Sequence, residues 1–156
     1  MAEDQQQQSF SIEKIYVKDI SVEVPGAPGV FRSKGDSPQV EMSFTNQFEK
    51  LEDDFYEVVI KATINAKSGD SSLFLVEDVQ AGIFQLKNIV GDALGFLLGG
   101  KCPNIMFPYL RETISDLVNK AGFPPVLLQP MDFEAIYRSQ HQSKAPEVKP
   151  EDVSTH

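Results

Sequence analysis

Cysteine and histidine are scarce in this sequence. Among 156 residues there is one cysteine, Cys102, and there are two histidines, His141 and His156. A single thiol cannot form an intramolecular disulfide, which is typical of proteins in a reducing cytosol. These side chains supply neither the ligand set of a zinc site nor the rigidly held base of a serine or cysteine hydrolase. We therefore expect a structural role for Cys102, with no metal, no cofactor and no enzymatic activity.

Signatures of nucleotide binding and of membrane insertion are missing as well. The sequence contains no Walker GxxxxGK[ST], GxGxxG or HExxH motif. No apolar run approaches the roughly 18–20 residues that cross a bilayer, and the opening MAEDQQQQ lacks the basic and apolar regions of a signal peptide. The formal net charge of −9 argues against nucleic acid as the main partner. These features predict a cytoplasmic protein that neither binds nucleic acid nor inserts into a membrane.

Alternating apolar and polar residues predict four strands. The first strand covers residues 10–24, with Tyr16 among the residues on its apolar side and Asp19 on its polar side. Ile15 and Val17 interrupt that polar side, so another subunit could cover part of it. The other three strands are predicted at residues 40–45, 56–66 and 73–86.

The connections between these strands indicate how the sheet is built. Residues 25–38 are rich in proline and glycine and predict a long loop, while residues 46–54 predict a polar connection. Residues 68–70, Ser-Gly-Asp, are typical of a hairpin. Gly82 indicates a bulge or a close backbone approach. Consecutive strands followed only by helices predict an α+β fold, with an antiparallel sheet and helices packed on one face.

One helix signal is much stronger than the others. It covers residues 109–121, with Pro108 in the first turn, where a missing N–H is tolerated, and Gly122 as a left-handed C-cap. Its apolar stripe consists of Leu110, Ile114, Leu117, Val118 and Ala121. Asp132 is the expected N-cap of a second helix that continues to about residue 140. The sequence therefore predicts a single domain over residues 9–142, with disordered tails at 1–8 and 143–156.

Apolar residues are more numerous than one covered sheet face requires. Residues 92–100 are apolar almost all round and must be buried within this subunit or between subunits, and their glycines, Gly95, Gly99 and Gly100, favour tight helix packing. Further apolar side chains that need cover are Val30, Phe31, Met106, Phe107, Tyr109, Phe133 and Tyr137. Unburied apolar surface of this kind is typical of protein-binding proteins. From the residues alone, a protein-binding module and a small structural or ligand-binding oligomer both remain possible.

Several short sequences, found in a fixed order, narrow these possibilities. The segment 102–126 reads CPNIMFPYLRETISDLVNKAGFPPV and follows AGIF at 81–84. Upstream are YVKDISVEVPGAP at 16–28 and DDFYEVV at 53–59. Over roughly residues 10–137 the sequence resembles the SecB family of export chaperones. The resemblance implies a homotetramer, a dimer of dimers, that holds unfolded precursor proteins without ATP and delivers them to SecA for Sec-dependent export.

The resemblance also implies roles for individual residues. SecA would dock on the acidic solvent face of the sheet, at Asp19, Glu23, Leu75 and Glu77. Unfolded clients would lie in a long apolar groove lined by Phe31, Val40, Met42, Phe44, Phe133, Ile136 and Tyr137. The helical stripe would also pack between dimers, through Leu110, Ile114, Leu117 and Val118. The alternative is a SecB-like chaperone dedicated to a single partner, such as an antitoxin.

Overall fold

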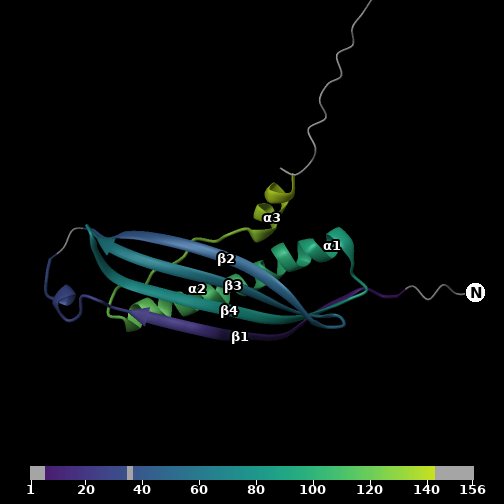
Figure 1. Cartoon of the computed structure of the whole chain (residues 1–156), viewed down its shortest axis with the longest axis horizontal. Coiled ribbons are helices and arrows are strands. Elements are labelled where there is room, and N and C mark those ends of the chain that lie inside the picture. The colour runs from purple at the N-terminus through teal and green to yellow at the C-terminus, as the bar shows by residue number, and fades with distance from the viewer. Residues whose placement is uncertain (1–5, 35–36, 143–156) are drawn as a thin grey trace, which may run out of the picture.

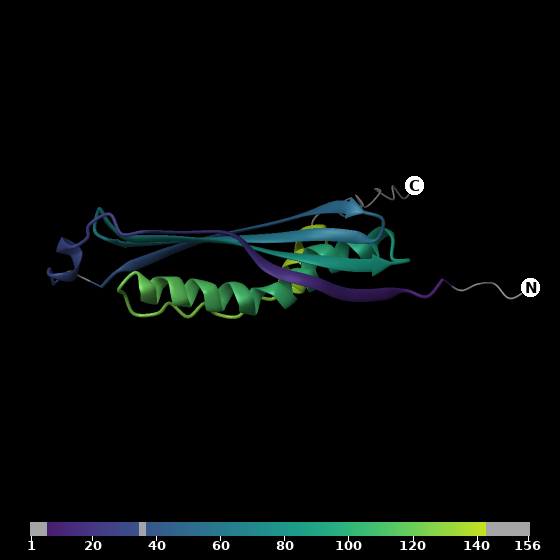
Figure 2. The ribbon, with the colours of Figure 1, turned by 90° about the horizontal axis from the view of Figure 1, so that it is seen from below.

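A single antiparallel sheet organises the molecule, with all helices on one side of it. The structure is a computed structural model and describes residues 6–34 and 37–142. The strands are β1 (Ser9–Glu23), β2 (Gln39–Glu52), β3 (Phe55–Ser68) and β4 (Ser71–Lys87), in the sheet order β1-β4-β3-β2 (Figure 1). Figure 2 shows the sheet nearly edge-on with the helical layer below it. This arrangement confirms the predicted fold class. The predicted tails lie largely outside the described residues.

The second strand is longer than its polar sequence indicates. The predicted connection over residues 46–54 is wrong, because pairing with β3 continues through Phe48 opposite Val58 and Lys50 opposite Tyr56. β2 lies at the edge of the sheet, where most side chains stay exposed and polar residues do not end a strand. The hairpin to β3 turns at Asp54, whose φ is 68°. Between β3 and β4 the predicted turn at Gly69 is confirmed, with a φ of 59°.

The helical layer begins earlier than the sequence predicts. α1 (Gly91–Phe96), a π-helical turn η2 (Leu97–Lys101) and α2 (Cys102–Lys120) follow one another without a break, so Pro108 lies inside a helix and not in its first turn. Pro103 has no N–H to donate to the carbonyl of Gly99 one turn earlier. Asn46 Nδ2 from β2 donates to that carbonyl instead, at 3.2 Å. A side chain distant in sequence therefore satisfies the carbonyl beside Pro103. The first-turn position predicted for Pro108 is wrong because the helix begins well before it.

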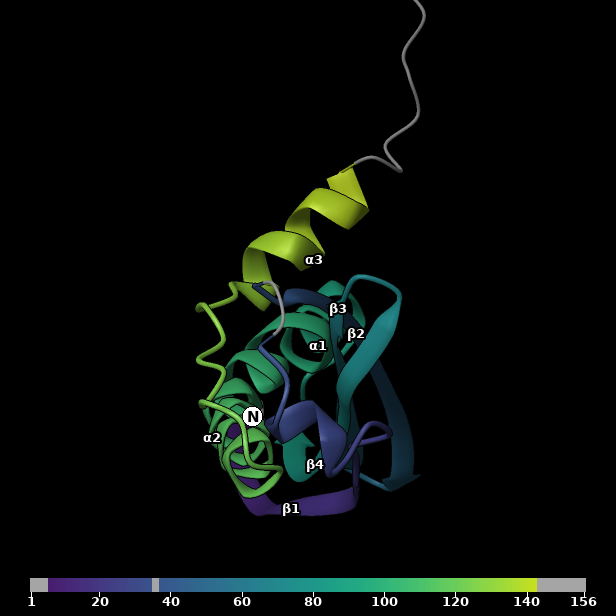
Figure 3. The ribbon, with the colours of Figure 1, turned by 90° about the vertical axis from the view of Figure 1, so that its left-hand side faces the viewer.

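The end of α2 is as predicted. Gly122 has a φ of 95°, and the amides of Gly122 and Phe123 donate to the carbonyls of Asn119 and Val118, at 3.0 and 3.3 Å. This is a Schellman motif, in which a left-handed glycine ends a helix. The chain then runs back along α2 to α3 (Phe133–Gln142), which projects away from the other layers in the end-on view of Figure 3. As predicted, Asp132 caps α3, since its Oδ1 accepts from the amide of Ala135 at 3.0 Å.

The core lies between α2 and the inner face of β3 and β4, which we call the helix side of the sheet. The predicted interface stripe of α2 belongs to this core: Leu110, Ile114, Leu117 and Val118 are between 0% and 7% exposed. These side chains contact the protomer's own sheet, so a second subunit can reach only the opposite face of α2. Gly82 allows the close approach that its position predicted. A Cβ there would lie 2.7 Å from the Phe84 ring and 3.3 Å from Met106 Sδ.

Candidate functional site

Two irregularities in β1 decide which side chains face outward. The pairing with β4 shifts register between Ile12 and Lys14, and again between Val17 and Asp19. Each shift adds one residue to β1 and reverses the alternation of its side chains. Ile15 and Val17 therefore lie on the helix side, and the prediction that they interrupt the polar face is wrong. Tyr16, predicted on the apolar side, instead shares the outer side with its β4 partner Ala81.

The four positions predicted to bind SecA lie together on the outer side of the sheet. Glu23 is directly opposite Leu75, and Asp19 is opposite Val79, two residues along β4 from Glu77. Asp19 and Glu23 are exposed, whereas Leu75 and Glu77 are partly buried. We call these four residues (Asp19, Glu23, Leu75 and Glu77) the outer-face cluster. It combines three carboxylates with one leucine, which suits a basic protein surface that also offers an apolar contact.

Contacts from β3 orient the carboxylate of Glu77. Thr63 Oγ1 donates to Glu77 Oε2 at 3.2 Å, and Lys61 Nζ lies 3.2 Å from Glu77 Oε1. The side chain of Glu77 is 30% exposed, so this carboxylate is partly enclosed and partly neutralised. Asp19 and Glu23 therefore carry most of the accessible negative charge of the outer-face cluster.

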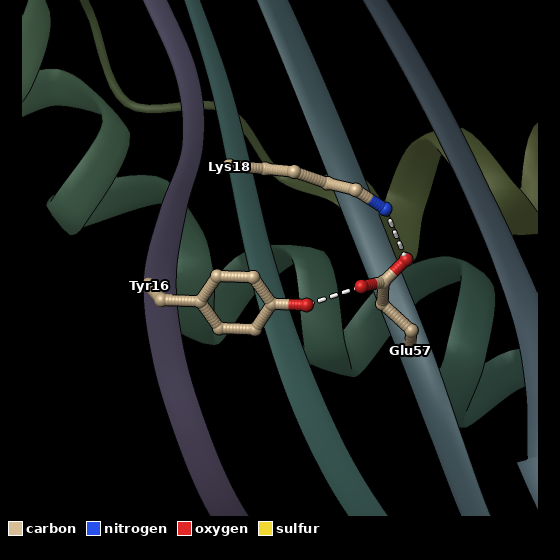
Figure 4. Close-up of polar contacts among 3 residues, drawn as sticks. All are labelled: Tyr16, Lys18 and Glu57. Carbon is tan, nitrogen blue, oxygen red and sulfur yellow. Dashed lines mark hydrogen bonds and ion pairs between the residues drawn. The ribbon is translucent and has the colours of Figure 1, made fainter.

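A second polar arrangement on the outer side was not predicted. Tyr16 Oη donates to Glu57 Oε2, and Lys18 Nζ lies 2.7 Å from Glu57 Oε1, so both β1 side chains cross β4 to reach β3 (Figure 4). Hydrogen bonds from Lys18 and then Tyr16 lower the pKa of Glu57. Burial, with the Glu57 bond, raises the pKa of Tyr16 to about 12. No sequence signal links these residues, because their contact depends on the register shifts in β1.

The helix side carries a groove between β2 and α3. Four of the seven predicted client residues, Phe44, Phe133, Ile136 and Tyr137, line a hollow of about 650 Å³. Val40 and Met42 face the same side of β2 nearer its start and are 48% and 47% exposed. Phe31 lies elsewhere, in the turn η1 (Gly29–Phe31), where its ring packs on Phe123 with the ring centres 5.2 Å apart. The structure therefore brings together four of these residues, extends the surface with two and separates Phe31.

Three glycines of α1 and η2 allow α3 to pack closely beside this groove. A Cβ on Gly99 would lie 2.5 Å from the Tyr137 ring, and one on Gly95 would lie 2.6 Å from the Tyr137 hydroxyl. A Cβ on Gly100 would lie 3.0 Å from Cα of Glu134. The prediction that these glycines permit tight helix packing is confirmed. Residues 92–100, predicted to be buried, are covered only in part, with Leu98 and Gly100 buried.

The substitution Gly99→Ala is expected to detach α3 from the groove. The added methyl group would overlap the Tyr137 ring, and overpacking of this kind costs about 1–3 kcal/mol. Hydrogen exchange over residues 133–142 should therefore become faster, while the sheet keeps its protection. In a Tyr137→Ala background the same substitution should have no such effect. If Gly99→Ala causes the same loss of protection with and without the Tyr137 ring, Gly99 is not required to make room for that ring.

The helix side also contains a buried carboxyl group without a partner. Asp78 on β4 is 0% exposed, and neither of its side-chain oxygens has a hydrogen-bond partner. Burial raises the pKa of Asp78 to about 7. Gln80, the next residue on this side, donates from Nε2 to the backbone oxygen of Tyr16 at 3.1 Å. Alternation predicts that Asp78 points inward, but no sequence rule predicts a charged residue there.

The remaining chemistry of the described residues is limited. Cys102 is fully buried, and burial raises the pKa of its thiol to about 12. Within residues 6–34 and 37–142, no three His, Cys, Asp or Glu side chains lie together in a way that could hold a metal ion. In the same part of the chain, no helix is both long enough and apolar enough to cross a membrane.

Comparison with known proteins agrees with the geometry. A solved structure of a SecB-like chaperone from Mycobacterium tuberculosis, in complex with a peptide from the HigA1 antitoxin, superposes with a TM-score of 0.63. It is 14% identical and covers 79% of this chain and 91% of its own. At that identity the likeness shows the fold alone.

Sequence relatives are much closer. The protein-export protein SecB of Methylobacillus flagellatus is 51% identical over 150 residues, which cover 93% of this chain and 95% of the relative. That of Chromobacterium violaceum is 52% identical over 146 residues, covering 93% and 97%. The family described as preprotein translocase subunit SecB matches residues 3–144. The chain therefore belongs to the SecB family.

Proposed function

We propose that this protein is an ATP-independent holdase of the cytoplasm. It binds unfolded precursor proteins, keeps them competent for translocation and delivers them to SecA for Sec-dependent export. The observation that carries this proposal is the groove of about 650 Å³ between β2 and α3, lined by Phe44, Phe133, Ile136 and Tyr137. The relatives that share half of its sequence are protein-export proteins, which favours general export over service to one dedicated partner.

The groove suits unfolded chains because of its position at an edge strand. Val40 and Met42 extend its apolar surface along β2, so a client could make several weak contacts in sequence. Such contacts on one tethered chain add to a useful overall affinity. A folded protein exposes too little apolar chain to engage them, and this difference would select unfolded clients. No nucleotide or metal takes part in this binding step.

SecA would dock on the other side of the sheet, at the outer-face cluster. The groove opens on the helix side, whereas Asp19 and Glu23 face outward, so a client and SecA could bind at the same time. A partner with basic groups would pair with these carboxylates and place an apolar side chain against Leu75. Separation of the two surfaces allows transfer without competition for one site.

We propose a dimer of dimers as the assembly, with contacts other than the stripe predicted from sequence. β1 is an edge strand, and Ile12, Val17, Ile20 and Val22 on its helix side are 39–47% exposed. An open edge with exposed apolar side chains favours pairing with a second copy. On α2 the face opposite the core presents Tyr109, which is 52% exposed, and this face is available to a second dimer.

The double substitution Asp19→Lys with Glu23→Lys tests the separation of surfaces. We expect SecA binding to weaken roughly tenfold or more, because two exposed carboxylates become repulsive, while the affinity for an unfolded client stays unchanged. Both affinities can be measured by isothermal titration calorimetry. A matched control, Glu13→Lys with Glu49→Lys, changes the net charge equally at exposed positions outside the cluster. Equal losses of SecA binding in the two variants would reduce the effect to net charge and contradict the proposed docking site.

A further inference from the structure

The outer-face cluster depends on the second register shift in β1. Val17 is opposite Gln80, and after the shift Asp19 is opposite Val79. Without the shift, Lys18 would take the place opposite Val79, and Asp19 would point to the helix side, opposite Asp78. A slip of one residue moves every following side chain to the other face of the sheet. The extra residue at Lys18 is therefore what turns Asp19 and Glu23 outward.

This bulge is held from both sides of the sheet. On the outer side, Glu57 accepts a hydrogen bond from Tyr16 Oη and pairs with Lys18 Nζ at 2.7 Å (Figure 4). On the helix side, Gln80 Nε2 donates to the backbone oxygen of Tyr16 at 3.1 Å. A bulge leaves part of the ladder unpaired; the Gln80 contact engages a backbone oxygen beside it, and Glu57 holds the side chains of the residues that flank Val17. Tyr16 and Lys18 are thereby fixed on either side of Val17.

Glu57 is well suited to this task. Its side chain is only 12% exposed, and each carboxylate oxygen has a partner. Hydrogen bonds to a charged group are shorter and stronger than those between neutral groups. Both partners belong to β1, whereas Glu57 belongs to β3, two strands away in the sheet order. One side chain thus ties the edge strand to the centre of the sheet at the point where its register changes.

We propose that Glu57 is a positioning residue for SecA docking. By holding Tyr16 and Lys18 it fixes the register of β1 that turns Asp19 and Glu23 toward the partner. This inference rests on the proposed docking function of the outer-face cluster, but the register itself can be measured without SecA. Glu57 does not have to contact SecA to have this effect.

The register can be read with engineered cysteine pairs. In the observed register Val22 is opposite Val76, so Val22→Cys with Val76→Cys should cross-link on oxidation. In the slipped register residue 21 would be opposite Val76, and Ser21→Cys with Val76→Cys would cross-link instead. We expect Glu57→Ala to lower the yield of the first pair and raise that of the second. Glu49→Ala is the matched control, because Glu49 is exposed and directly opposite Glu57 on β2.

Binding measurements complete the test, with SecA and an unfolded client as probes. Glu57→Ala should weaken SecA binding about tenfold and leave client binding within about twofold. Tyr16→Phe should act in the same direction with a smaller effect, and it changes no charge because the pKa of Tyr16 is about 12. Tyr16→Phe also keeps the test decisive if Glu57→Ala fails to fold.

Three results would overturn the proposal or separate it from its premise. An unchanged cross-link pattern with unchanged SecA binding would show that Glu57 does not set the register. An unchanged pattern with weakened SecA binding would make Glu57 a direct or electrostatic contact instead of a positioning residue. If Asp19→Lys with Glu23→Lys leaves SecA binding intact, the outer-face cluster is not the docking site. The proposed role of Glu57 in SecA docking is then overturned, even if the cross-links shift as expected.

Discussion

The variant Asp78→Asn should be more stable than the wild-type protein at pH 8, by about 2–4 kcal/mol. Asparagine keeps the size of aspartate but cannot ionise. Burial raises the pKa of Asp78 from 3.8 to about 7, so the folded protein resists ionisation that the unfolded chain accepts. Below about pH 4 the group is neutral in both states and contributes no difference. Stability is then lost as the pH rises toward 7, and the loss is constant above that value.

Urea unfolding at several pH values measures this effect. The difference between Asp78→Asn and wild type should be smallest below about pH 4, be clearly present at pH 5, grow further up to about pH 7 and then remain flat. Asp19→Asn is the control, since Asp19 is an exposed carboxylate on the adjacent strand. A curve of the same shape for this variant would show that the effect does not depend on the burial of Asp78. A difference for Asp78→Asn that is the same at pH 5 and pH 8 would show that Asp78 is not the titrating group.

The second large effect is expected for Ile114→Glu. Ile114 is 0% exposed between α2 and the sheet, so a glutamate there would place a charge in the core. Burying an unpaired charge costs about 4 kcal/mol or more, which approaches the whole stability of a small domain. We expect the variant to be unfolded or aggregated. It should not be a folded protein of smaller oligomeric state.

Tyr109→Glu provides the comparison on the same helix. Tyr109 is 52% exposed on the opposite face of α2, so the substitution should leave the fold intact. Circular dichroism with multi-angle light scattering separates the two cases. If Ile114→Glu instead gives a folded protein with half the wild-type mass, the stripe is a subunit interface and its assignment to the core is wrong.

The difference between these two positions shows a limit of sequence periodicity. A stripe such as Leu110, Ile114 and Leu117 identifies a helix and its buried face, but the spacing is the same whether the cover is a sheet or another subunit. In the folded protomer these side chains are already buried against the sheet, so the sheet is the cover that the spacing alone could not identify. Sequence alternation likewise identified all four strands, because neighbouring residues in a strand point to opposite faces of the sheet.

Two predictions failed where features outside a short window of sequence decide the local structure. Pro108 lies inside a helix because the helical layer begins at Gly91, well before the apolar stripe from which the helix was predicted. Tyr16 was assigned to the wrong face because one inserted residue, between Ile12 and Lys14, reverses the alternation of β1 before it. Neither the insertion sites nor the contact with Glu57 have a signal within any short window of sequence. The outward orientation of Asp19 and Glu23 was predicted correctly, because the second insertion restores the alternation that the first one reverses.

The groove combines predictable and unpredictable parts in the same way. The stripe of α3 identifies Phe133 and Tyr137 as residues that need cover. That they line one hollow with Phe44, and that Tyr137 lies against Gly95 and Gly99, depends on where the helix returns after the linker. Resemblance to known chaperones placed Phe31 in the same groove, whereas the fold packs it against Phe123.

Suppression of aggregation tests the holdase function most directly. A slowly refolding protein is diluted from denaturant without nucleotide, with the chaperone equimolar as its proposed tetramer, and light scattering is followed. We predict that the wild-type protein keeps the client soluble and that Ile136→Lys, which places a charge in the groove, requires a several-fold higher concentration. Val90→Lys, at an apolar position that is 78% exposed and does not line the groove, should behave as wild type. Scattering that is unaffected by the wild-type protein, or suppressed equally by Ile136→Lys, would contradict client binding in this groove.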